Sequence, residues 1–287
     1  MVSILTGLST AAILFIVSAG LSLVFGTMRI INMAHGTFYM IGAYLVTLAF
    51  AGLTMRATGF VIALILAAVL VSVLGIVIEM FVLRRLYQSE HLFQLLATWG
   101  LMLVLEEVTL IVWGPNNVTG SIPGGLSGSF AIGGQSFPFY NAFLIGAALV
   151  IAALLWLLLK FTPLGRIIRA AVQDTELIYT LGVNVKRLYT QVFALGTFLA
   201  ALGGALVAPS TSLGPGMDAQ IVMEAFIVSV IGGLGSIWGT ALGALVIGLF
   251  QSLGNLIAPE VAALAPYLVM ILVLIIRPTG IFGKAEA

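Results

Sequence analysis

Three polar residues stand at the start of an apolar segment of this chain. Asn32, His35 and Tyr39 are spaced i, i+3 and i+7, so they share one face of a helix. An amide, an imidazole and a phenol can bind a small polar solute, or they can hold a helix end by hydrogen bonds. Polar groups in hydrocarbon are costly unless they are satisfied. We favour a hydrogen-bonded helix start, with His35 bonded to a carbonyl, and keep Asn32 and His35 as candidates for lining a translocation path.

Two adjacent carboxylates, Glu106 and Glu107, lie inside another apolar segment. An ionisable residue within a membrane span is a functional candidate by default. Neighbouring residues on a helix point about 100° apart, so the two carboxylates cannot both face one substrate. Proton coupling is one hypothesis; hydrogen bonding across helices by one carboxylate, with the other near the outer water, is the alternative. Glu224 falls near the outer end of a later helix, and the sequence predicts no role for it.

A glycine-rich break interrupts the apolar stretch Ile221–Leu256, which is too long for one membrane helix. The break lies at residues 232–236, and the piece before it, Ile221–Ile231, would cover only about 16 Å as a helix. We expect a half-length helix, the break and then a full helix. Transporters often place irregular, glycine-interrupted helices beside the substrate path. Gly232, Gly233 and Ser236 therefore join Asn32 and His35 as predicted path residues.

Other kinds of chemistry find little support in the sequence. The chain has no cysteine, and its two histidines, His35 and His91, are too few for a histidine-rich metal site. It contains no Walker A pattern, so it cannot hydrolyse ATP itself. A net charge of +1 with no basic stripe argues against binding to nucleic acid. We expect a protein that is not an enzyme and that uses no cofactor and no metal.

The composition requires lipid as the solvent for these elements. Hydrophobic residues make up 61% of the chain and charged residues 7%, whereas a soluble domain carries about 25% charged residues. We predict an all-α fold, a polytopic transmembrane helix bundle of eight to nine membrane elements that forms one domain over residues 1–287. The expected spans are Ile4–Phe25 (a retained helix, not a signal peptide), Ala34–Leu53, Phe60–Leu83, Leu92–Trp113, Tyr140–Phe161, Leu188–Ala208, the broken Ile221–Leu256 and Val261–Ile276.

The placement of lysine and arginine predicts the orientation, because cytoplasmic loops collect these residues. The loops Gly114–Phe139 and Pro209–Gln220 contain neither residue, so we expect both to face outward. Counting the broken segment as two elements puts the N-terminus outside and the C-terminus in the cytoplasm. The residues expected on the cytoplasmic side are Arg84, Arg85, Lys160, Arg166, Arg169, Lys186, Arg187, Arg277 and Lys284.

The most informative loop covers residues 162–187. It is too polar to cross the bilayer, yet it is rich in helix-forming residues. Arg169, Val172 and Gln173 share one helical face, and Gly182 suits a helix end. An ordered, charged cytoplasmic helix suggests a docking surface. A solvated connector that holds positive charge on the inside is the equal alternative from the residues alone.

Short motifs in this loop and along the chain resemble those of a known family. This loop resembles the coupling loop of branched-chain amino acid ABC permeases, of the first membrane-subunit type. The matching pattern is Gly165-Arg166, Arg169-Ala170, Asp174, Leu181-Gly182-Val183 and Lys186-Arg187. Where the family commonly has alanine, this chain has Ile178 or Tyr179. Four further motifs follow in the family's order: Asn32-Met33-Ala34-His35-Gly36, Leu95-Leu96-Ala97-Thr98-Trp99-Gly100-Leu101, Gly232-Gly233-Leu234-Gly235-Ser236 and Arg277-Pro278-Thr279-Gly280-Ile281-Phe282-Gly283.

The resemblance implies a membrane permease of a bacterial ABC importer in the inner membrane. Its expected partners are a second permease subunit in a heterodimer, two cytoplasmic ATP-binding subunits, a periplasmic or lipid-anchored substrate-binding protein, and membrane lipid. The coupling residues would be Arg169, Asp174, Leu181 and Gly182. Branched-chain or related hydrophobic amino acids are the expected cargo. Similar permeases for urea, amides or aromatic acids remain open, as does a proton-coupled secondary transporter that uses Glu106 or Glu107.

Overall fold

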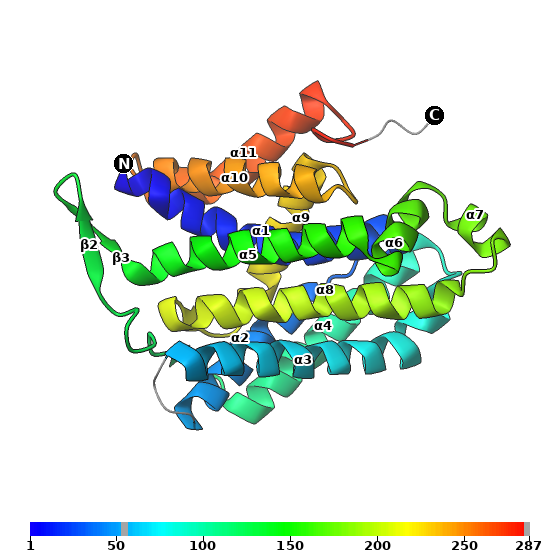
Figure 1. Ribbon diagram of the computed structural model, residues 1–287, viewed down its shortest axis with the longest axis horizontal. Helices are drawn as coiled ribbons and strands as arrows, with labels where there is room; N and C mark the ends of the chain where they lie inside the picture. Colours follow the sequence, from blue (N-terminus) through cyan, green and yellow to red (C-terminus); the bar gives the residue numbers. More distant parts are fainter. Residues whose placement is uncertain (53–56, 284–287) are drawn as a thin grey trace.

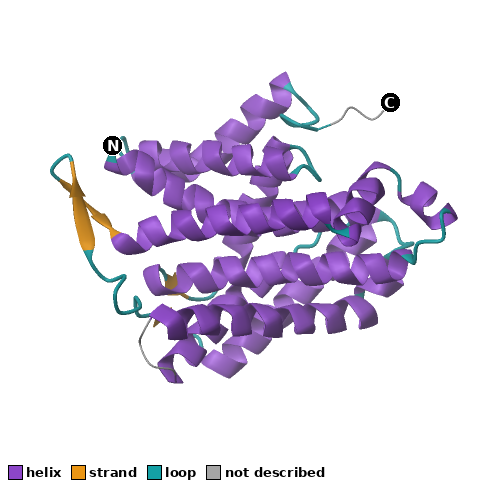
Figure 2. Ribbon diagram, viewed as in Figure 1, coloured by secondary structure: helices purple, strands orange, loops and turns teal. Residues whose placement is uncertain are grey.

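The computed structural model describes residues 1–52 and 57–283, and most of them are helical (Figure 2). This confirms the predicted all-α class. The helices are α1 (Val2–Met28), α2 (His35–Gly52), α3 (Ala57–Phe81), α4 (His91–Trp113), α5 (Phe139–Phe161), α6 (Pro163–Gln173), α7 (Thr175–Thr180), α8 (Val185–Val207), α9 (Met217–Gly232), α10 (Ile237–Gly254) and α11 (Pro259–Ile276), with short 3₁₀ turns η1 (Leu83–Leu86) and η2 (Ala208–Ser210).

Every predicted span overlaps one of the long helices. Seven described helices are long and apolar enough to cross a membrane: α1, α3, α4, α5, α8, α10 and α11. The predicted half-length helix was too short, because α9 begins at Met217 and has 16 residues, or about 24 Å. Leu53, the predicted end of the second span, and Lys284 lie outside the described residues.

Helix α1 runs through the interior of the bundle, whereas α4 lies at its edge. The most apolar window of α1 is 83% buried, against 11% for α4. Small residues let α1 approach α8, since a methyl group at Gly20 would lie 2.7 Å from the carbonyl oxygen of Gly196. Close backbone contact of this kind is a common way to join helices in lipid. The apolar faces of α3, α4 and α5 point outward, as lipid or a partner subunit requires.

The N-terminus and a β-hairpin lie at one end of the bundle, the hairpin end (Figure 1). In the hairpin, β2 (Ser129–Ile132) pairs antiparallel with β3 (Gln135–Pro138). A second short pair joins β1 (Val118–Thr119) to β4 (Ser212–Leu213), so the loop after α4 holds the segment between α8 and α9. Both pairs fall in loops that the sequence predicts to face outward.

The opposite end carries α6 and α7 (Figure 1). A buried carboxylate, Glu79 of α3, organises the neighbouring turn: it forms a salt bridge of 3.2 Å with Arg84 and accepts a 2.8 Å hydrogen bond from Thr190 of α8. The hydroxyl of Tyr87 also donates to Glu79. Burial and this hydrogen bond raise the pKa of Tyr87, while the bond to Glu79 raises the pKa of Arg84. The cluster ties α3, η1 and α8 together at this end.

Candidate functional site

The first predicted path residues lie where α2 begins, deep in the bundle. Asn32 and His35 are almost completely buried. Nε2 of His35 lies 3.0 Å from the carbonyl oxygen of Val17, halfway along α1. This is the carbonyl bond expected for a hydrogen-bonded helix start. Neither Asn32 nor His35 lines the cavity described below, and their role in a path stays a prediction.

The two adjacent carboxylates of α4 point in different directions, as their spacing predicts. Glu106 accepts a 3.2 Å hydrogen bond from the backbone N–H of Gly216, just before α9. Glu107 is exposed on the outer face of α4. The carboxylate of Asp218, which the sequence did not single out, lies near Glu106, is fully buried and accepts a hydrogen bond from Thr37. Neither Glu106 nor Glu107 lines the cavity.

The glycine break between α9 and α10 is a tightly packed junction. Gly233 has a φ of 96°, which favours glycine. The chain after α11 folds back onto the break: Phe282 N–H donates to the carbonyl of Gly232 at 3.1 Å. The side chain of Ser236 caps α10 by accepting from Gly239 N–H at 3.1 Å. The predicted path residues Gly232, Gly233 and Ser236 thus join α9, α10 and the C-terminal segment, away from the cavity.

The loop at residues 162–187 forms two helices where the sequence predicted one. Thr162 caps α6, and Asp174 ends α6 and caps α7 by accepting a 3.0 Å hydrogen bond from Leu177 N–H. Gly182 follows α7 with a φ of 81°, as its predicted place at a helix end requires. The predicted coupling residues share one property, exposure at this end: Arg169, Asp174, Leu181 and Gly182.

Exposed apolar side chains accompany these polar residues. Tyr179 is 72% exposed and Leu181 is 73% exposed, and Leu177 is exposed beside them. Ile178 is buried and anchors α7 to the bundle. We refer to Leu177, Tyr179 and Leu181 as the α7 apolar patch. Such a patch on a polar loop is typical of a protein–protein contact.

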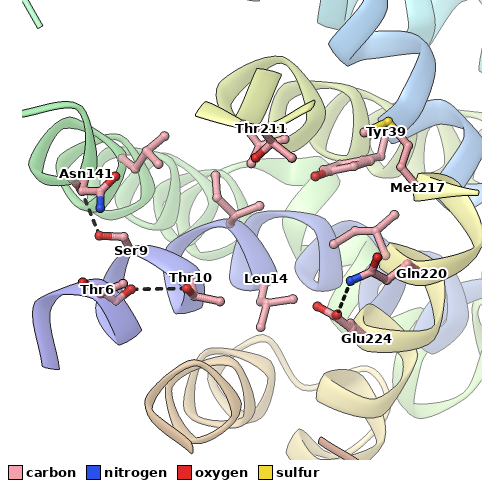
Figure 3. A pocket seen from close by; sticks show the side chains of 14 residues that line it. Thr6, Ser9, Thr10, Leu14, Tyr39, Asn141, Thr211, Met217, Gln220 and Glu224 are labelled. Carbon is pink, nitrogen blue, oxygen red and sulfur yellow. Dashed lines mark hydrogen bonds between the residues drawn. The ribbon is translucent and has the colours of Figure 1, made fainter. Parts of the chain in front are cut away.

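A cavity of about 280 Å³ opens among five segments near the hairpin end. Its lining residues come from the first half of α1, Tyr39 of α2, the start of α5, the end of α8 with the connection that follows it, and the first half of α9 (Figure 3). One part of the lining is polar: Thr6, Ser9, Thr10, Tyr39, Asn141, Thr211, Gln220 and Glu224. The rest is apolar: Ile13, Leu14, Leu144, Val207, Met217 and Ile221.

Glu224 supplies the one carboxylate of this lining. Its Oε1 accepts a 3.2 Å hydrogen bond from the side-chain amide of Gln220, one turn earlier on α9. Figure 3 shows this pair at one end of the cavity and Ser9 with Asn141 at the other. The sequence held two signals for this site: Gln220 and Glu224 at i and i+4, and Thr6, Ser9 and Thr10 at i, i+3 and i+4. Neither pattern alone indicates a binding site, and only the fold brings the two sets of residues together.

Comparison with known proteins identifies the family. A family model described as branched-chain amino acid transport system / permease component matches residues 3–274. The chain belongs to this family. It is 28% identical to the high-affinity branched-chain amino acid transport system permease protein LivH of Escherichia coli, over 98% of this chain and 94% of that protein. Its identity to BraD of Pseudomonas aeruginosa, a permease protein of the same description, is also 28%, over 99% of this chain and 95% of BraD.

More distant relatives share part of the chain or the fold alone. The ribose import permease protein RbsC of Haemophilus influenzae is 33% identical over 38% of this chain and 36% of its own length. A chain of PsaBC from Streptococcus pneumoniae, solved in complex with Fab, has a TM-score of 0.50 and 15% identity, covering 96% of this chain and 92% of that one. This structure supports the arrangement of the helices.

The family places the protein among the permeases of ABC importers, in a superfamily that handles branched-chain amino acids and sugars. It is a multi-pass permease of the inner membrane, and permeases of this kind work with ATPase and binding-protein partners. The family consists of transporters, in agreement with the prediction that the chain is not an enzyme. The resemblance to branched-chain amino acid permeases is confirmed.

Proposed function

We propose that this permease moves branched-chain amino acids into the cell through the cavity near the hairpin end. The match of the family model to residues 3–274 carries the proposal. The apolar part of the lining, which includes Leu14, Leu144 and Ile221, suits an aliphatic side chain. A uniformly polar solute such as urea or a sugar would place its polar groups against these apolar residues.

The partner that supplies energy docks, in this proposal, at the end that carries α6 and α7. The α7 apolar patch and the exposed Arg169 and Asp174 offer the mixed apolar and charged surface that protein interfaces use. Two ATP-binding subunits would contact this loop and its counterpart on a second permease subunit. The N-terminus then faces outward, and the hairpin end meets the substrate-binding protein, which is periplasmic or lipid-anchored.

A contact route leads from that docking surface toward the cavity. The side chain of Val172 on α6 packs against Gly26 and Gly235, at the end of α1 and in the glycine break. The Ser22 hydroxyl of α1 accepts a 3.1 Å hydrogen bond from Gly235 N–H. Helix α9 then extends from the break to Glu224. Movement of α6 would therefore reach α9, as alternating access between two states requires.

Purification from the native membrane in mild detergent, with mass spectrometry of the associated chains, tests the proposed assembly. We expect a second permease-like chain and two ATPase chains per complex. A homo-oligomer without ATPase, from membranes in which the complex survives extraction, would contradict it and favour a proton-coupled transporter. No contact among the residues that the structure describes favours that alternative, since Glu106 bonds to the backbone of Gly216 and Glu107 does not line the cavity.

A further inference from the structure

We propose that Glu224 binds the ammonium group of the transported amino acid and thereby selects solutes that carry a positive charge. The inference rests on the proposed function, because it takes the cavity near the hairpin end as the place where the solute binds. It adds the chemical group that the cavity recognises and the residue that recognises it.

The charge of the lining is the first part of the case. Glu224 is the one acidic residue among the lining residues, and no lysine, arginine or histidine accompanies it. Within the described part of the chain, the salt bridge between Arg84 and Glu79 is far from this site and does not involve Glu224. A carboxylate that is partly buried, as Glu224 is, is costly without a partner. A cationic group on the solute supplies the missing counter-charge.

The hydrogen-bonding character of the cavity points the same way. The hydroxyls of Thr6, Ser9 and Thr10 donate to backbone carbonyls of their own helix, at 3.1, 3.0 and 3.3 Å. Their protons are thus engaged, and the lone pairs that remain can accept. Glu224 also only accepts when it is ionised. A cavity rich in acceptors fits an ammonium group, which has three donors and no acceptor.

The remaining lining completes the match to an amino acid. The apolar residues Leu14, Leu144 and Ile221 line the same cavity and suit an aliphatic side chain. A solute of the same size without a cationic group would leave the charge of Glu224 without a counter-charge, and an unpaired charge that is partly buried is unfavourable.

A structural role for Glu224 is the competing explanation. Its carboxylate bonds to Gln220 on its own helix and interacts with Gln251 of α10. Glutamine in its place keeps the size and an oxygen that accepts from Gln220, and removes the negative charge. The variant Glu224→Gln therefore separates recognition of a cation from support of α9.

The experiment uses the complete complex, with its partner permease, ATPase subunits and binding protein, in liposomes that contain ATP. Leucine uptake and ATP hydrolysis are measured together for the wild type, Glu224→Gln and Glu224→Asp. Glu260→Gln is the matched control, because Glu260 is exposed in the first turn of α11 and lines no part of the cavity. Losing a charged hydrogen bond should lower leucine imported per ATP about tenfold or more in Glu224→Gln.

In the same assay, ATP hydrolysis stimulated by the binding protein should persist in Glu224→Gln. Leucine uptake should be intermediate in Glu224→Asp. Both quantities should equal those of the wild type in Glu260→Gln. Wild-type uptake by Glu224→Gln would overturn the inference. Parallel loss of uptake, ATP hydrolysis and thermal stability would also overturn it, in favour of a structural role. If the wild type imports a solute without a cationic group and no leucine, both proposals fail. If it imports another solute with a cationic group in a Glu224-dependent way, only the proposed cargo fails.

Discussion

The hydroxyl of Thr37 donates a 3.0 Å hydrogen bond to the carboxylate of Asp218. This bond joins the first turn of α2 to the first turn of α9, although the two residues are 181 positions apart. Both side chains are fully buried. The start of α2, which His35 ties to α1, is therefore also tied to the helix that carries Glu224. The junction borders the cavity, because Tyr39 of α2 and Met217 of α9 both line it (Figure 3).

The junction leaves no room for a side chain at Gly36. A methyl group there would lie 2.0 Å from the backbone carbonyl oxygen of Asp218, so one of the two helices must move. We expect Gly36→Ala to destabilise the protein by about 1–3 kcal/mol, the usual cost of overpacking. Thermal unfolding of the detergent-solubilised protein measures this effect. Gly100→Ala is the control, since a methyl group at Gly100 of α4 meets nothing within 4 Å; equal stability of the two variants would refute the tight junction.

The sequence predicted most of the helices because membrane helices are set by local composition. Each apolar run of sufficient length became a helix, and the glycines at residues 232–236 marked the break between α9 and α10. The helix ends were less predictable. Helix α9 begins four residues before its apolar core and includes the polar Asp218 and Gln220. Asp218 is held by a buried hydrogen bond, and Gln220 lines the cavity. The two short strand pairs were missed, since strands of two to four residues leave no periodic signal.

The functional site was much less predictable than the helices. The residues proposed for coupling, which are exposed in the structure, were predicted through family resemblance, and the place of Gly182 at a helix end through its residue type. The cavity is different, because it depends on the convergence of five segments that are distant in the sequence. Thr10 and Gln220 look like ordinary polar residues near helix ends until the fold places them around one space. Glu224 drew attention as a charge, yet its role could not be assigned without its neighbours.

The contact of Val172 with the glycine break predicts partial uncoupling when the side chain is shortened. Val172→Ala removes methyl groups that pack against Gly26 and Gly235. Residues along a coupling route modulate it by about 0.5–2 kcal/mol, so leucine imported per ATP should fall about two- to thirtyfold. Simultaneous measurement of uptake and ATP hydrolysis gives this ratio. Val150→Ala, on the exposed face of α5, should leave the ratio unchanged; the same ratio in both variants would argue against the route.

Asp174 tests the docking surface through two substitutions with different consequences. Asp174→Asn keeps an oxygen that can cap α7, whereas Asp174→Lys loses the cap, worth about 0.5–2 kcal/mol, and reverses the charge. We expect Asp174→Lys to insert normally and to lose the ATPase subunits, and Asp174→Asn to retain most of their binding. Co-purification of the ATPase subunits with each tagged variant measures this. Undiminished ATPase binding and uptake in Asp174→Lys would show that the loop is not the docking surface.

The energy source of transport is the most direct test of the central claim. Purified complex in liposomes is given labelled leucine and the binding protein, with either ATP on the ATPase side or an imposed proton gradient without ATP. We predict leucine uptake with ATP and none with the proton gradient alone. Uptake that needs no ATP, follows the proton gradient and is lost in Glu106→Gln or Glu107→Gln would contradict an ABC importer and establish a secondary transporter.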